Sequence, residues 1–178
     1  LLALQGPKAN EVLQKLIDFD LSQLKSYSFV KSDIKGIKEV IISTTGYTGS
    51  GGVELYVNNV DAIKLYNLLI ETGKYLDIKP IGLAARDTLR LEMGYCLYGN
   101  DINDATNPIE AGLKWATKTN KDFIGKTHVV NSIENGIEKK LICFILNERG
   151  IPRKDYKIFD PEQNEIGVVT SCLLYTSD

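Results

Sequence analysis

The chain has 178 residues, enough for one ordinary domain or two small ones. Its 21 Lys and Arg residues against 23 Asp and Glu residues give a net charge of -2, so its charge does not favour nucleic acid or an anionic membrane as a partner. The 3 cysteines are far apart without a CxxC pattern, and no apolar run approaches the about 18 residues of a membrane span, which predicts a soluble protein of a reducing compartment without structural zinc.

The first segments predict a strand, a turn and a helix. Residues 1–5 form an apolar run that ends at Gly6-Pro7, and apolar residues then recur at steps of three and four from Ala9 to Ile17. Because the chain starts without an initiator Met, in what has the pattern of a strand within a domain, we expect it to be a fragment. Further strands are expected over residues 27–31, 36–44 and 53–57.

The strand over residues 53–57 alternates between apolar and polar side chains. Its apolar face holds Val53, Leu55 and Val57. Glu54 points to the opposite face. The preceding glycine-rich segment, residues 46–52, lacks the Lys-Ser/Thr of a phosphate loop and is followed by a strand where a phosphate loop has a helix. We therefore interpret this segment as a tight strand connection whose shape presents Tyr47.

Two helices are expected next, each with an apolar face toward a core. The apolar side of the first helix, which follows Asn58 and ends before Gly73, is expected to consist of Ile63, Tyr66, Leu69 and Ile70. The second helix runs from about residue 81 to 93 with an apolar stripe at steps of four, and Arg86 and Arg90 fall together on another face. This order of elements predicts an α+β domain, an antiparallel sheet with helices layered on one face, whose other face is free to hold a ligand.

The second half of the chain predicts a change of architecture. Residues 107–115 predict a turn that runs into a short strand with Trp115 in the core, and residues 126–135 predict a helix. Strand-like runs separated by turn clusters follow at residues 140–146, 156–159 and 165–170. We expect a domain over residues 1–130, a boundary near 131–137, and over 137–178 the start of a truncated all-β barrel domain.

Glu54 and Arg86 are charged residues that could either lie on the surface or bind a ligand. Each is compatible with an ordinary solvated surface position, and Arg86 with a weak exposed pair to the neighbouring Asp87. However, a held carboxylate can accept two N–H bonds from an amidine-like heterocycle, and an arginine fork suits a carboxylate. Folates carry both of these groups.

The remaining candidate residues do not indicate a specific functional site. His128 is the only histidine, so no Ser-His-Asp triad and no metal cluster can be built around it, and we interpret it as a surface or half-buried residue. Tyr95 and Tyr98, just after the second helix, fit either the walls of a pocket or ordinary packing.

A series of short motifs runs along nearly the whole chain, up to about residue 171. The motifs are Leu-Leu-Ala-Leu-Gln-Gly-Pro-Lys-Ala (1–9), Gly-Tyr-Thr-Gly-x-x-Gly-Val-Glu (46–54), Gly-Leu-Ala-Ala-Arg-Asp-Thr-Leu-Arg-Leu-Glu (82–92), Leu-Tyr-Gly-Asn-Asp-Ile (97–102), Asn-Pro-Ile-Glu-Ala-Gly-Leu (107–113), Asp-Phe-Ile-Gly-Lys (122–126) and Ile-Gly-Val-Val-Thr-Ser (166–171). In this order they resemble the aminomethyltransferase (T-protein) family of the glycine cleavage system. The ordered set is specific, whereas any one motif alone would be weak.

The resemblance implies an enzyme with tetrahydrofolate as its cofactor and the lipoylated H-protein and other glycine cleavage components as partners. The reaction would transfer the methylene of the aminomethyl-dihydrolipoyl arm to tetrahydrofolate and release ammonia. By the same resemblance Glu54 holds the pteridine ring, Tyr47 and Tyr95 line its pocket, and Arg86 contacts the p-aminobenzoyl-glutamate portion. We expect a monomer in the cytoplasm, or in the mitochondrion of a eukaryote.

The chain departs from the family pattern at three places. The catalytic Asp of the family lies in an N-terminal part that this chain lacks, so the catalytic residue stays unknown and we expect the fragment itself to be inactive. Ser50 stands where an acidic residue is common. The family continues after residues 170–171 with a barrel segment that bears another folate-contacting Arg, whereas this chain reads Cys-Leu-Leu-Tyr-Thr-Ser-Asp; residues 172–178 are therefore expected to be foreign to the domain.

Two other functions share the expected folate pocket. Non-catalytic relatives linked to iron–sulfur assembly and tRNA modification carry Lys-Gly-Cys-Tyr-x-Gly-Gln-Glu where this chain has Met-Gly-Tyr-Cys-Leu-Tyr-Gly-Asn (93–100), so the residues favour the enzyme. Folate-linked demethylases and the folate domains of sarcosine-type dehydrogenases are the other alternative.

Overall fold

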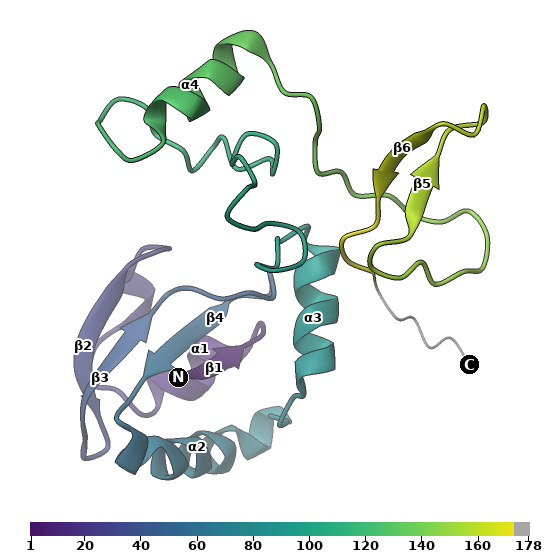
Figure 1. The fold of residues 1–178 in the computed structure, drawn as a ribbon. Helices are drawn as coiled ribbons and strands as arrows, with labels where there is room; N and C mark the ends of the chain where they lie inside the picture. Colours follow the sequence, from purple (N-terminus) through teal and green to yellow (C-terminus); the bar gives the residue numbers. More distant parts are fainter. Residues whose placement is uncertain (173–178) are drawn as a thin grey trace. The chain divides into compact units, whose positions relative to one another are not determined.

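The computed structural model describes residues 1–172, which fall into two compact units (Figure 1). The first unit is Leu1–Met93, and the second begins at Gly94. The domains expected over residues 1–130 and 137–178 stay a prediction. Most of the tail that we expect to be foreign, residues 173–178, lies outside the described residues.

The first unit is built on a four-stranded antiparallel sheet in the order β1-β4-β3-β2. Its strands are β1 (Leu2–Gln5), β2 (Phe29–Ile34), β3 (Ile37–Ser43) and β4 (Gly52–Tyr56). Strands β2 and β3 are joined by Lys35 and Gly36, whose φ angles of 45° and 83° suit a two-residue hairpin turn, which needs positive φ at both positions. The predicted strands are therefore present, and all pair with a neighbour in the sheet.

The three α-helices of this unit occur where the sequence predicts them, one after β1 and two after β4, and two 3-10 turns are added. They are α1 (Ala9–Gln14), the 3-10 turn η1 (Leu21–Gln23), α2 (Asn59–Gly73), the 3-10 turn η2 (Lys74–Leu76) and α3 (Leu83–Glu92).

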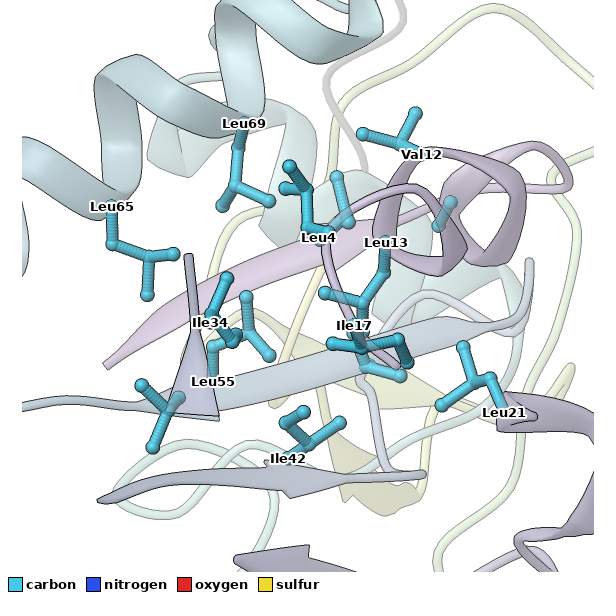
Figure 2. Close-up of a cluster of buried hydrophobic side chains, with 14 of the residues drawn as sticks. Leu4, Val12, Leu13, Ile17, Leu21, Ile34, Ile42, Leu55, Leu65 and Leu69 are labelled. Carbon is cyan, nitrogen blue, oxygen red and sulfur yellow. The ribbon is translucent and has the colours of Figure 1, made fainter. Parts of the chain in front are cut away.

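One face of the sheet carries the hydrophobic core (Figure 2). The register places Leu4 opposite Val53 and Ile42 opposite Leu55, so these side chains share a face, and all of them are buried. The helices add buried residues to the same cluster, among them Val12, Leu13, Leu65 and Leu69. Helices α1 and α2 thus cover one face of an antiparallel sheet, which confirms the α+β architecture.

The apolar face expected for α2 is wrong in part. Leu69 is buried as expected and Ile70 is half-buried, but Ile63 and Tyr66 are 76% and 40% exposed. Leu65, one turn before Leu69, and Gly73 are the other buried residues of the helix. Gly73 is the last residue of the helix, and a Cβ at this position would lie 2.8 Å from the Ile78 Cβ. The helix carries apolar residues on more than one side, and close packing of its C-terminal turn determines which side faces the core.

The apolar stripe expected to bury α3 is also wrong. Ile81 and Met93 are 66% and 48% exposed, and the fully buried side chain of the helix is Arg90. Asp87 Oδ1, one turn earlier, lies 2.7 Å from Arg90 Nη2 and accepts a bond from Arg90 Nε. A buried guanidinium requires such a charged partner, which here comes from the same helix.

The second unit contains one helix and one hairpin among its described residues. Helix α4 is Lys126–Asn135, as predicted, and β5 (Lys157–Phe159) pairs antiparallel with β6 (Glu165–Val168). The strand expected over residues 140–146 is wrong: Leu141 donates its N–H to Glu110 O, and no ladder continues from this bond in the described part of the chain. An apolar run of this kind forms a strand only where a partner strand pairs with it.

The segment at residues 107–115 differs from its prediction as well. It is a run of turns with no strand, and Trp115 is 65% exposed, so its expected core position is wrong. Asn107 and Ala111 are buried in this segment, and Asn107 Nδ2 donates a 2.8 Å hydrogen bond to Ser132 Oγ of α4. The motif therefore packs by anchoring an amide to a helix.

Candidate functional site

Glu54 lies in the interior of β4 on the face opposite the core. The register pairs it with Ala3 of β1 and Ser43 of β3, and its neighbours Val53 and Leu55 are fully buried on the other side. The Glu54 side chain is half-buried. Helices α1 and α2 cover the core face, so this carboxylate stands on the face that the sequence predicted to be free for a ligand.

Hydroxyl groups orient the carboxylate. Thr45 Oγ1 donates to Glu54 Oε2, and Ser43 Oγ lies 2.9 Å from the same threonine oxygen. Since the Thr45 proton is used on the carboxylate, Ser43 is the donor in the second bond, and the chain runs from Ser43 through Thr45 to Glu54. A carboxylate has about four lone-pair positions, so Glu54 keeps acceptor capacity beyond this bond.

The glycine-rich loop of residues 46–52 connects β3 to β4 and contacts α3. The Arg86 guanidinium lies over the Tyr47 ring, with Cζ 4.7 Å from the ring centroid. Gly49 has a φ of 66°, and a Cβ there would come within 2.5 Å of the Met93 side chain, so the loop approaches α3 closely. Two residues predicted for the site, Tyr47 and Arg86, are thus in direct contact, which is worth about 0.5–1 kcal/mol at an exposed position.

The other tyrosines considered for the site belong to the second unit. Tyr95 is half-buried, and Tyr98 is 64% exposed. The Tyr98 hydroxyl donates to Asp104 Oδ1, and this bond raises the pKa of Tyr98 above its ordinary value, because ionisation would place a phenolate beside a carboxylate. Of the predicted site residues, Tyr47, Glu54 and Arg86 belong to the first unit, and Tyr95 is described with the second.

The described residues, 1–172, hold neither a cluster of metal ligands nor a membrane-spanning helix. No group of 3 or more His, Cys, Asp and Glu side chains gathers there as a metal site. None of Cys96, Cys143 and Cys172 forms a disulfide among the described residues. No helix of this part of the chain combines the length and apolarity needed to span a bilayer.

Sequence and structure comparisons place this architecture among known proteins. The family model described as "GCVT N-terminal domain" matches residues 1–121. Curated aminomethyltransferases of Flavobacterium psychrophilum and Bacteroides fragilis are 54% and 51% identical to the chain over 171 and 172 residues, and each match covers 96% of this chain and 48% of the relative.

A solved structure shares the fold. The structure titled "Crystal structure of glycine cleavage system aminomethyltransferase T from Bartonella henselae" matches with a TM-score of 0.83 and 34% identity, over 94% of this chain and 45% of that chain. The antiparallel sheet with helices on its core face is therefore a fold shared with a solved aminomethyltransferase structure. The chain belongs to the GCVT N-terminal domain family, and it spans about half the length of the curated relatives that it matches.

Proposed function

We propose that the protein containing this chain is an aminomethyltransferase of the glycine cleavage system. It would transfer the methylene of an aminomethyl group on the dihydrolipoyl arm of H-protein to tetrahydrofolate, with release of ammonia. The observation that carries the proposal is the 54% identity to a curated aminomethyltransferase over 96% of the chain. The oriented, half-buried carboxylate on the free face of the sheet supports it from the structure.

Tetrahydrofolate is the cofactor that we propose for this face, and its nitrogen would accept the transferred carbon. The residues present fit it: Glu54 offers a fixed acceptor for paired N–H donors of a pteridine, and the Arg86 guanidinium offers a fork for the carboxylate of the glutamate portion. Tyr47, held by Arg86, supplies an aromatic wall. Tyr95 is proposed as a second wall.

The chain's own residues would contribute binding and orientation. A carboxylate held by Thr45 fixes the angle of the bound ring, and orientation of two reactants is a large source of rate enhancement. A fixed negative charge also stabilises positive charge that develops nearby as ammonia departs. The catalytic acid or base stays unassigned on this chain.

Partners, oligomeric state and compartment are proposed from the same family relationship. Lipoylated H-protein and the other glycine cleavage components are the proposed partners, and a cytoplasmic monomer is the proposed state. The curated relatives quoted above are bacterial.

Ammonia release tests the proposed function. The gene product that contains this chain is mixed with aminomethyl-loaded H-protein, with and without tetrahydrofolate, and we expect folate to accelerate ammonia release by at least about tenfold through orientation. H-protein without the aminomethyl load is the control. Absence of acceleration would contradict the proposal, and folate binding without ammonia release would favour the non-catalytic relatives.

A further inference from the structure

We propose that Gln5 is a positioning residue of this site, which holds the loop between β3 and β4 and thereby sets the Glu54 carboxylate and the Tyr47 ring. The inference rests on the proposed function, because it takes Glu54 as the ligand-binding group. Gln5 is the last residue of β1 and is half-buried. Two positions after Ala3 on the strand, it points to the same face of the sheet as Glu54.

The Gln5 amide bonds to both ends and the middle of the loop. Its Nε2 donates to Thr45 O at 3.3 Å, before the loop, and to Val53 O at 3.0 Å, after it. Its Oε1 accepts from Thr48 Oγ1 at 3.1 Å. One side chain therefore restrains the segment on either side of Tyr47, using both the donor and the acceptor of its amide.

The backbone at Gly46 and Gly52 packs closely against the end of β1 and the Gln5 amide. A Cβ at Gly46 would lie 2.0 Å from Gln5 Oε1, and a Cβ at Gly52 would lie 2.3 Å from Leu4 O. Gly6 N–H also donates to Gly51 O at 2.9 Å, so the end of β1 is joined to the loop by backbone as well. The loop is thus folded closely around the Gln5 side chain.

The restraint reaches the candidate site through Thr45. The carbonyl of this residue is held by Gln5, and its hydroxyl orients Glu54. Tyr47 lies between Thr45 and Thr48, both of which are hydrogen-bonded to Gln5, and the Tyr47 ring contacts Arg86. Loss of the amide would let Thr45 and Tyr47 turn, so the carboxylate and the aromatic wall would lose their common orientation.

Replacing this amide by an apolar chain of similar length tests the inference in the gene product. Gln5→Met is compared with Gln14→Met, a matched control, because the Gln14 amide also closes a loop, donating to Phe19 O and accepting from Leu21 N–H on the core side of the unit. We expect Gln5→Met to raise the dissociation constant of tetrahydrofolate about tenfold and Gln14→Met to change it less than about twofold, although both lower the unfolding midpoint.

Two further measurements separate positioning from general loss of structure. Because Gln5 acts through Glu54, Gln5→Met combined with Glu54→Gln should bind folate no more weakly than Glu54→Gln alone. In the folate-free protein, hydrogen exchange at Thr45 and at loop residues 46–52 should rise in Gln5→Met and not in Gln14→Met. Unchanged loop exchange, or equal loss of affinity in both single variants, would overturn the inference.

The exchange measurement needs no ligand. If the wild-type protein binds no tetrahydrofolate, the proposed function fails on that result, and the exchange result still decides whether Gln5 holds the loop.

Discussion

Glu54→Gln is expected to weaken tetrahydrofolate binding by about 10- to 100-fold. The carboxylate is held on the free face of the sheet by Thr45, and hydrogen bonds to a charged acceptor contribute about 1.5–3 kcal/mol each, where 1.4 kcal/mol corresponds to tenfold. The amide that replaces it keeps the size of the side chain and loses both the charge and one acceptor oxygen. Isothermal titration of the gene product with tetrahydrofolate measures the change.

Ser50→Ala is the matched control for this substitution. Ser50 is exposed in the same loop, and its hydroxyl bonds only locally, donating to Thr48 O at 3.3 Å. We expect its dissociation constant to stay within about twofold of the wild type, as for surface substitutions in general. If Glu54→Gln also binds tetrahydrofolate as tightly as the wild type, Glu54 is a surface residue with no ligand.

Leu65→Ala is expected to lower the free energy of unfolding by about 2–5 kcal/mol, the range for truncating a fully buried leucine. Leu65 is 0% exposed where α2 packs on the sheet. Its loss removes apolar contacts and leaves a cavity beneath the helix. Urea unfolding monitored by circular dichroism measures the effect as a shift of the midpoint at constant slope.

Ile63→Ala, two positions earlier on the same helix, distinguishes the observed packing from the pattern predicted by the sequence. Ile63 is 76% exposed, so little apolar surface is returned to water, and alanine has the higher helix propensity. We expect a change within about 0.5 kcal/mol. A loss for Ile63→Ala as large as that for Leu65→Ala would instead favour the face expected from the sequence.

The boundaries of the elements were predicted well where local chemistry marks them. Helix α4 lies between Gly125 and Gly136, whose φ angles of 87° and 91° are typical of glycine, and its observed span is the expected one. The β2–β3 turn at Lys35-Gly36 was not predicted: Gly36 was expected inside a strand, and β2 continues to Ile34, beyond its expected end. Strand β4 was predicted by its period-two alternation, which needs only consecutive residues.

The faces and partners of the elements were predicted less well. The spacing of apolar residues in α3 indicated a buried stripe, whereas the buried side chain is Arg90, paired with Asp87. The apolar run at residues 140–146 has no partner strand among the described residues, so it forms no strand. Periodicity states which residues share a face, and only the neighbours of an element decide whether that face is covered.

In the candidate site, too, the local features were predictable from the sequence and the long-range contacts were not. The sequence by itself determined that Glu54 points away from the core, because Val53 and Leu55 on either side are apolar, and its ordered motifs determined the family. Only the tertiary structure brought Arg86 over Tyr47 and the Gln5 amide into the loop, since these contacts join segments far apart in the chain. Alternation along a strand is local, whereas the close approach of loop, strand end and helix depends on how the whole unit packs.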